Sequence, residues 1–158
     1  MVRAATVQDL PSVMAIYDTA RRYMRANGNT VQWVNGYPSE PLLRQDIRDG
    51  VLYVMEDGDG VYAVFAFIIG DDPTYGHIEG AWRDGSPYGT IHRLGSDGTH
   101  RGVFAETAAW AVRQCPHLRA DTHADNLTMR HCMEKAGFVY CGVIHVADGT
   151  PRVAYEKV

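Results

Sequence analysis

The sequence predicts a three-layer α+β domain in which a mixed, mostly antiparallel sheet of seven strands is flanked by helices. Three observations lead to this prediction. The N-terminal third has helical periodicity, the middle of the chain has strand-like composition around a hairpin signal, and the C-terminal half alternates between the two patterns. Because domains commonly hold about 100–200 residues, we expect the 158 residues to form one domain, spanning residues 1–158.

The N-terminal region predicts two helices, the first from about Asp9 to Ala26. Thr6 and Asp9 have the spacing of a capping box, and Asn27-Gly28 is a stop signal. Apolar side chains recur with helical spacing along one stripe of this helix: Leu10, Val13, Tyr17, Ala20 and Met24. A second helix is expected over about residues 39–50, between a serine cap and a glycine stop.

The rest of the chain predicts the strands and two more helices. The segments with strand-like composition are 51–56, 61–69, 77–82, 88–94, 118–122, 138–146 and 152–157. Asp-Gly-Asp-Gly at 57–60 separates the first two segments and is a strong hairpin signal. Helices are expected at 103–114, which is apolar on almost every side, and at 125–136, which ends at Gly137.

Composition narrows the classes of protein that fit. The 46% hydrophobic and 22% charged residues are typical of a soluble globular protein. A net charge of −4 without a Lys/Arg run argues against nucleic-acid binding, and no apolar run approaches the ~20 residues that span a membrane. The start MVRAATVQDL does not look like a secretory signal, so a cytoplasmic protein is expected. Three separated cysteines without a CxxC pair argue against a disulfide framework and a metal site.

The segment from Tyr88 to Phe104 reads as a strand, a glycine-bearing loop and the start of a helix. Such a loop offers backbone N–H groups and the positive end of a helix dipole, which together suit a diphosphate. Glycine also lets a backbone approach a ligand closely. The alternative is that Gly95, Gly98 and Gly102 only form a turn, since this motif is weak by itself.

A second segment carries a more specific pattern. Leu118-Arg-Ala-Asp-Thr-His-Ala-Asp-Asn126 is followed by Glu134-Lys-Ala-Gly-Phe138. Together with Ile91-His-Arg-Leu94, this spacing resembles the C-terminal half of the GNAT superfamily of N-acetyltransferases. The resemblance covers about Tyr88 to Val158, and the first half of the chain fits through its order of elements. It implies the GNAT acyl-CoA N-acyltransferase fold, acetyl-CoA as cosubstrate and a primary amine as acceptor.

The resemblance also implies which residues bind acetyl-CoA. The backbone of Leu94, Gly95 and Ser96 would pair with the pantetheine beside the thioester, and Asn126 matches the asparagine that reaches the pantetheine arm. The pyrophosphate loop and first helical turn would comprise His100, Arg101, Gly102, Val103 and Phe104.

Two departures from the family pattern stand out. Family loops usually read Arg/Gln-x-x-Gly-x-Gly/Ala, whereas this loop keeps only Gly102 and has Phe104 in place of a small residue. Many members also carry a tyrosine that protonates the departing thiolate, and Met133 at that position cannot donate a proton. Either Cys132, another tyrosine or solvent protonates the thiolate, or no acid is needed. The last alternative is chemically reasonable, because a thiol with an ordinary pKa of about 8.5 gives a thiolate that can leave without protonation.

Attack on a thioester requires an uncharged amine, whereas free alkylamines are protonated at pH 7. A base or a water chain must therefore remove a proton from the amine. His92 is the first candidate, because in some relatives a histidine there faces the acceptor site and an ordinary histidine pKa near 6.5 suits a base. The alternative is a strand histidine bonded to the backbone. Glu79 is the second candidate, as a base acting through water or as a clamp for a cationic acceptor.

Gln32, Trp33 and Tyr37 lie in the loop between the first two helices, which in such enzymes often lines the acceptor pocket. Ordinary packing is the alternative for the aromatic residues. The partner that we expect is a small-molecule or peptide amine, and a homodimer is compatible with the sequence. The competing function is a non-catalytic acyl-CoA sensor or regulatory domain with the same fold, which Met133 and the reduced glycine pattern favour.

Overall fold

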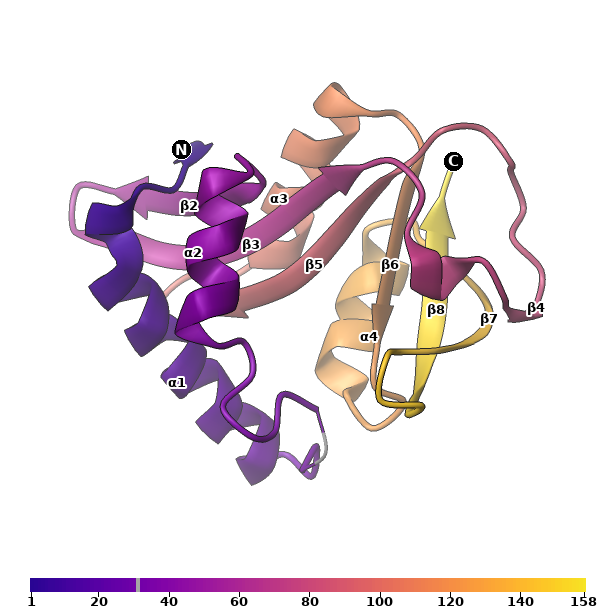
Figure 1. Cartoon of the computed structure of the whole chain (residues 1–158), viewed down its shortest axis with the longest axis horizontal. Helices are drawn as coiled ribbons and strands as arrows, with labels where there is room; N and C mark the ends of the chain where they lie inside the picture. Colours follow the sequence, from indigo (N-terminus) through magenta and orange to yellow (C-terminus); the bar gives the residue numbers. More distant parts are fainter. Residues whose placement is uncertain (31) are drawn as a thin grey trace. The chain divides into compact units, whose positions relative to one another are not determined.

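The structure is a computed structural model that describes residues 1–30 and 32–158 (Figure 1). The helices are η1 (Val7–Asp9), α1 (Leu10–Ala26), α2 (Glu40–Arg48), η2 (Pro73–Tyr75), α3 (Val103–Gln114) and α4 (Leu127–Lys135). The strands are β1 (Val2–Ala4), β2 (Leu52–Asp57), β3 (Gly60–Ile69), β4 (Glu79–Gly80), β5 (Gly89–Ser96), β6 (Leu118–Thr122), β7 (Val139–His145) and β8 (Pro151–Lys157). They form one sheet in the order β1-β2-β3-β5-β6-β8-β7-β4.

The predicted mixed, mostly antiparallel sheet is confirmed, with eight strands where the sequence predicted seven. Strands β5 and β6 pair in parallel, whereas the pairs β1–β2, β2–β3, β4–β7, β6–β8 and β7–β8 are antiparallel. The additional strand, β1, pairs with β2 and is too short to show an alternating pattern. The segment predicted as a strand at 77–82 contributes only the two residues of β4, which pair with β7 at the edge of the sheet.

The residues divide into two compact units. The first comprises Met1–Phe67 with Arg93–Val103, and the second comprises Ile68–His92 with Phe104–Val158. The chain passes between them three times: within β3, within β5 and at the start of α3. That the whole chain acts as a single domain stays a prediction.

In the first unit, the apolar stripe of α1 packs into a core with α2, β2 and β3 (Figure 1). The fully or almost fully buried members include Leu10, Val13, Ile16, Tyr17, Leu43, Leu52, Val54 and Val64. Ser39 caps α2 as the sequence predicted, because its Oγ accepts a hydrogen bond from the Leu42 N–H. The predicted capping box is also present, and the Thr6 N–H donates to Asp9 Oδ2 at 2.8 Å.

Asp9 binds Arg3 as well, through two hydrogen bonds of 2.8 and 2.9 Å. Chiefly because of the Arg3 hydrogen bond, the pKa of Asp9 falls from 3.8 to about 2. A carboxyl with a lowered folded-state pKa stabilises the fold above its unfolded-state pKa, and this stabilisation is lost as the pH falls through the folded-state value.

We therefore expect Asp9→Asn to lower the free energy of unfolding by about 1 kcal/mol at neutral pH, since solvent screens this partly exposed pair. Urea denaturation between neutral pH and pH 2 should show the variant and the parent converging at the acid end. Glu40→Gln, which removes an exposed pair with Arg44, should cost no more than about 0.5 kcal/mol. A difference that grows on acidification would contradict the assignment.

In the second unit, different elements pack on the two faces of the sheet. Successive residues of a strand point to opposite faces, so the contacts of β8 show which element packs on which face. On β8, Tyr155 and Lys157 face α4: the Tyr155 hydroxyl accepts from Arg130 Nε, and Lys157 Nζ donates to the Ala136 carbonyl. Glu156, between them, faces the segment of residues 70–88 and accepts from the Arg83 N–H at 2.7 Å. Helix α4 therefore covers one face, and the 70–88 segment with η2 covers the other.

Candidate active site

Strand β5 carries four of the predicted site residues, and its backbone becomes left-handed at Arg93, with φ 52°. This conformation costs a residue with a side chain ~1–2 kcal/mol. Two contacts hold it: the Tyr17 hydroxyl donates to the Arg93 carbonyl oxygen at 2.6 Å, and the Arg93 guanidinium binds Asp46 Oδ2 at 2.8 and 3.1 Å. Asp46 on α2 is only 5% exposed. The strand is therefore kinked directly after His92.

The electrostatics of this kink favour a charged guanidinium. Burial by itself would lower the pKa of Arg93, but neighbouring Tyr37 and Asp46 outweigh it and raise that pKa. Burial raises the pKa of Tyr17, so its hydroxyl keeps the proton that it donates. The pairing of Arg93 with Asp46 was not predicted from the sequence. The available signal was a carboxylate at 46 on the same stripe of α2 as the buried Leu43.

Leu94, Gly95 and Ser96 follow the kink. Gly95 is buried, and a Cβ there would lie 3.1 Å from a ring carbon of Tyr17, so the close approach of this ring explains the glycine. The Ser96 side chain accepts a hydrogen bond from the Gly98 N–H at 3.2 Å. Packing and a turn thus account for Gly95 and the Ser96 hydroxyl, while contacts from their backbone to a ligand stay a prediction.

The loop before α3 is organised by its own polar residues. Asp97 Oδ1 accepts from the Thr99 N–H and hydroxyl at 2.9 and 2.6 Å. The His100 ring stacks on Tyr62 at 3.6 Å between centroids, and its Nε2 lies 2.7 Å from Asp57 Oδ2. The His100 ring is therefore fixed, whereas Arg101 is exposed.

Phe104, which stands where the family has a small residue, is buried in the second unit. Its ring packs edge-on against Phe138 at 5.4 Å between centroids. Asn126 caps α4, because its Oδ1 accepts from the Met129 N–H at 3.1 Å. This bond does not use the amide nitrogen of Asn126. The buried Met133, 2% exposed, supplies no acidic proton.

His92 lies at the end of the paired part of β5. Three residue pairs join β5 to β6: Gly89–Ile91 with Leu118–Ala120. The next residues along the two strands, His92 and Asp121, both bind the turn at η2. His92 Nε2 lies 2.8 Å from Asp72 Oδ2, and the Tyr75 hydroxyl donates to Asp121 Oδ1 at 2.6 Å. The turn at η2 therefore contacts both β5 and β6 at the point where the pairing of their residues ends.

Asp72 forms hydrogen bonds through both carboxylate oxygens and through its backbone N–H. Its Oδ1 accepts from the Thr74 N–H at 2.8 Å and hydroxyl at 2.7 Å, and its own N–H donates to the Tyr88 hydroxyl at 2.8 Å. Burial would raise the pKa of Asp72, but the hydrogen bonds from His92 and Thr74 outweigh it and lower the pKa to about 2. Burial and the nearby Asp121 raise the pKa of Tyr75 well above 10, so that hydroxyl remains a donor.

The other predicted residues lie on other elements. Glu79 on β4 is separated from β5 by three strands, so with about 4.8 Å between neighbours a flat sheet would place their backbones ~19 Å apart. Trp33 is 9% exposed and packs edge-on against Tyr17 in the first core. Gln32 accepts a hydrogen bond from Asn29, and Tyr37 is 40% exposed. Their roles toward an acceptor stay predictions.

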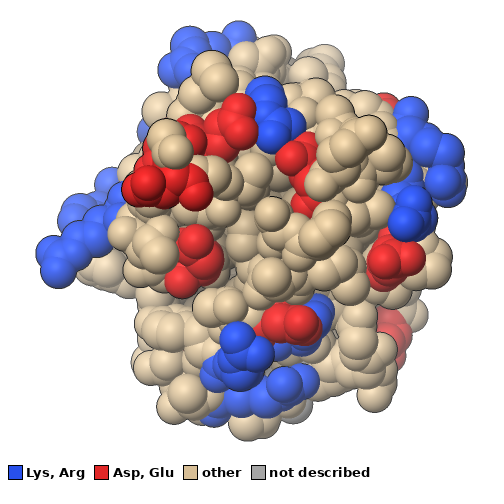
Figure 2. Space-filling view, turned by 90° about the vertical axis from the view of Figure 1, so that its left-hand side faces the viewer, with Lys and Arg blue, Asp and Glu red and all other residues tan. Residues whose placement is uncertain are grey.

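Figure 2 shows a face on which basic and acidic side chains are interspersed. Within residues 1–30 and 32–158, no group of three or more His, Cys, Asp or Glu side chains is arranged to hold a metal ion. None of the helices described in these residues has both the length and the apolar character that crossing a membrane requires.

No family model matches the sequence, and no curated protein is similar enough to count as a match. Solved structures do match. An acetyltransferase of the GNAT family from Streptococcus agalactiae 2603 is 30% identical, with 100% of this chain and 94% of that chain covered and a TM-score of 0.91.

Two further structures are less similar in sequence and share the fold. A GNAT-family acetyltransferase from Listeria monocytogenes 4b F2365 is 17% identical over 99% of this chain and 93% of that chain, with a TM-score of 0.73. A ribosomal-protein-alanine N-acetyltransferase from Brucella melitensis is 19% identical over 100% and 99% of the two chains, with a TM-score of 0.65. The match to the streptococcal protein, which extends over the whole of this chain, identifies the chain as a member of the GNAT family of acetyltransferases.

Proposed function

We propose that this chain is an acetyl-CoA-dependent N-acetyltransferase that transfers the acetyl group to the primary amine of a small molecule or protein, with His92 as the base. Family membership supports acetyl transfer. The observation that carries the proposal is the bonding of His92: Nε2 binds Asp72, and among the described residues none offers a hydrogen-bond partner to Nδ1. A ring nitrogen with a lone pair available is what a general base requires.

The loop before α3 supports binding of a diphosphate. Gly98 and Gly102 have φ values of 82° and 70°, and apart from the residues adjacent in the chain no described atom lies within 4 Å of where a Cβ would stand on either. A ligand can therefore approach this backbone closely, next to the N-terminus of the 12-residue α3. We propose that this loop binds the pyrophosphate of acetyl-CoA, with Arg101 as its cationic side chain.

We further propose that the backbone of Leu94–Ser96 and the amide nitrogen of Asn126 bind the pantetheine arm. Bound acetyl-CoA supplies a thioester whose carbonyl carbon accepts the amine nitrogen. A carbon–nitrogen bond then forms, the carbon–sulfur bond breaks, and the amine loses one proton. In this proposal His92 takes that proton, and the thiolate leaves without help from a tyrosine, because a thiol ionises with an ordinary pKa of about 8.5.

The test is to incubate the protein with acetyl-CoA and a panel of amines while following the release of free thiol. Once an accepted amine is found, His92→Ala is expected to lower kcat by about 10- to 100-fold, since a positioned base contributes on that order or more. The dissociation constant for acetyl-CoA should stay within about twofold. His145→Ala, at an exposed histidine of β7, is the matched control and should retain the activity of the parent.

Unchanged turnover in His92→Ala would end the assignment of the base. Thermal stabilisation by acetyl-CoA with no thiol release from any amine would instead favour an acyl-CoA sensor. The buried Met133 at the position of the family tyrosine is the observation that favours this second function.

A further inference from the structure

We propose that Asp72 is a positioning residue: it holds His92 in the tautomer that carries its proton on Nε2, so that Nδ1 is the atom that accepts the proton of the amine. This inference rests on the proposed function, in which His92 is the base. It adds a residue outside the motif that the sequence resembles, and it names the reactive nitrogen.

The tautomer follows from the chemistry of the partner. Nε2 of His92 lies 2.8 Å from Asp72 Oδ2, and an ionised carboxylate offers only acceptors. The lowered pKa of Asp72 keeps this carboxylate ionised at neutral pH. Nε2 must therefore be the donor, and in the neutral ring Nδ1 then has no hydrogen and an available lone pair.

The orientation of the ring is fixed by what holds Asp72. Thr74 occupies Oδ1 with two hydrogen bonds, which leaves Oδ2 directed at His92. The turn itself is anchored on the neighbouring strand, because Tyr75 binds Asp121. The carboxylate therefore cannot rotate away from His92 without breaking the turn at η2.

The His92 side chain is only partly buried, with 21% of it exposed. The residues described around it place no hydrogen-bond partner on Nδ1. When Nδ1 takes a proton from the amine, the ring becomes an imidazolium, and the Asp72 carboxylate stabilises that charge while remaining ionised. The proton moves from the amine to Nδ1, and no proton passes to Asp72.

The first measurement uses the unmodified protein. A ¹⁵N NMR spectrum of the imidazole of His92, recorded at a pH where the ring is neutral and assigned by comparison with His92→Ala, reports which nitrogen carries the hydrogen. We expect a protonated Nε2 and an unprotonated Nδ1. A protonated Nδ1 would overturn the proposal, whatever the kinetics show.

The second measurement uses Asp72→Asn, which can still cap η2 through its carbonyl oxygen but turns an amide N–H₂ donor toward Nε2. The expected results are a reversed tautomer in the spectrum and a kcat lowered about 10- to 100-fold, because the misplaced proton blocks the base. KM for the amine should change by less than about threefold. Asp71→Asn, which makes the same change at the neighbouring exposed carboxylate, is the matched control and should keep the parent tautomer and the parent activity.

The outcomes separate this inference from the proposed function. A reversed tautomer in Asp72→Asn with unchanged kcat would overturn the positioning role. Full activity in His92→Ala would remove the base itself, and the positioning role with it, even if the spectrum shows the expected tautomer. If Asp72→Asn does not fold, the spectrum of the unmodified protein still decides whether Nδ1 is available.

Discussion

Replacing Glu156 by alanine is expected to lower the free energy of unfolding by about 3–5 kcal/mol, the range for removing one partner from a buried charged pair. Glu156 has no exposed surface, and both carboxylate oxygens are used. Oε1 accepts from the Arg83 N–H at 2.7 Å, and Oε2 accepts from Arg119 Nε at 3.1 Å and lies 2.6 Å from Nε2 of His117.

The loss is large because Arg119 and His117 are themselves only 5% and 4% exposed. Arg119 lies between the rings of Trp82 and Tyr88, at 4.0 Å from each centroid, and its other contact is the Asp84 carbonyl. Without Glu156 the guanidinium would keep its desolvation cost and lose its counter-charge. Because these contacts also fix the 70–88 segment on the sheet, the variant should in addition lose part of its catalytic activity.

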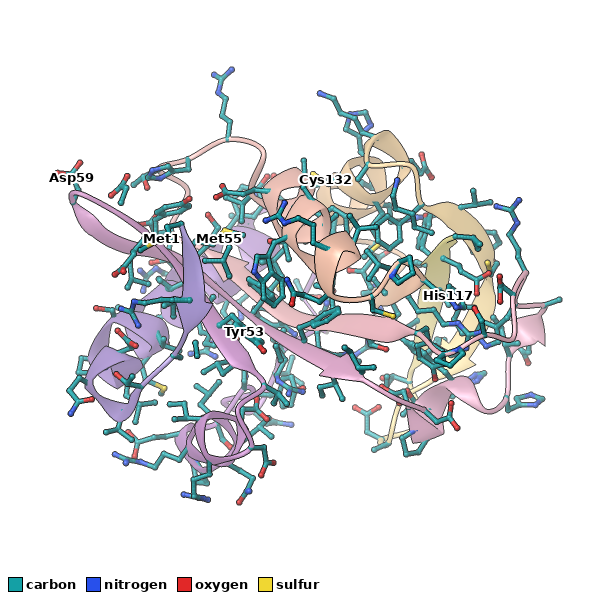
Figure 3. All side chains as sticks on the ribbon, turned by 90° about the horizontal axis from the view of Figure 1, so that it is seen from above. Met1, Tyr53, Met55, Asp59, His117 and Cys132 are labelled. Carbon is teal, nitrogen blue, oxygen red and sulfur yellow. The ribbon has the colours of Figure 1, made fainter. Side chains whose placement is uncertain are left out.

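Urea denaturation monitored by circular dichroism measures the effect. Asp59→Ala, at the exposed tip of the β2–β3 hairpin (Figure 3), is the matched control and should stay within about 0.5 kcal/mol of the parent. A loss below about 1 kcal/mol in Glu156→Ala would mean that water or a rearrangement replaces the carboxylate.

Local sequence signals were sufficient for the long elements of the fold. Helix α3 matches its predicted bounds, since its sequence is rich in apolar residues, starts after a glycine and can be recognised without knowledge of its partners. The strands β1 and β4 could not be predicted correctly. They hold three and two residues, too few to show periodicity, and their pairing with β2 and β7 depends on contacts between residues far apart in the sequence.

The candidate site also combines a residue that could be predicted from the sequence with one that could not. His92 could be singled out because a histidine on a strand of the recognised motif has an obvious chemical use. Asp72 could not, since Asp-Asp-Pro at 71–73 reads only as a turn. Only the folded chain places this turn on His92 and Asp121, where the pairing of β5 with β6 ends. Residues that act through a partner distant in sequence leave no local signature.

Asp46 and Arg93 likewise leave no local signature in the sequence, because they are 47 positions apart. They form a nearly buried ion pair. Asp46→Ala is expected to lower the free energy of unfolding by about 3 kcal/mol, because the Arg93 guanidinium would lose its counter-charge in a site where it is about one-eighth exposed. Thermal or urea denaturation checks this. Asp49→Ala, at the exposed end of α2, is the control and should change stability by less than about 0.5 kcal/mol.

The Asp46 variant should also bind acetyl-CoA more weakly, by about tenfold or more. The ion pair helps to hold the left-handed backbone at Arg93, a conformation that costs ~1–2 kcal/mol and is retained only while its contacts compensate for it. Without the pair the strand can relax toward ordinary extended geometry, which would move the Leu94–Ser96 backbone that we propose as the pantetheine contact. Isothermal titration with acetyl-CoA measures this effect. A variant that is less stable yet binds acetyl-CoA as tightly as the parent would show that the kink serves the fold and not the cosubstrate.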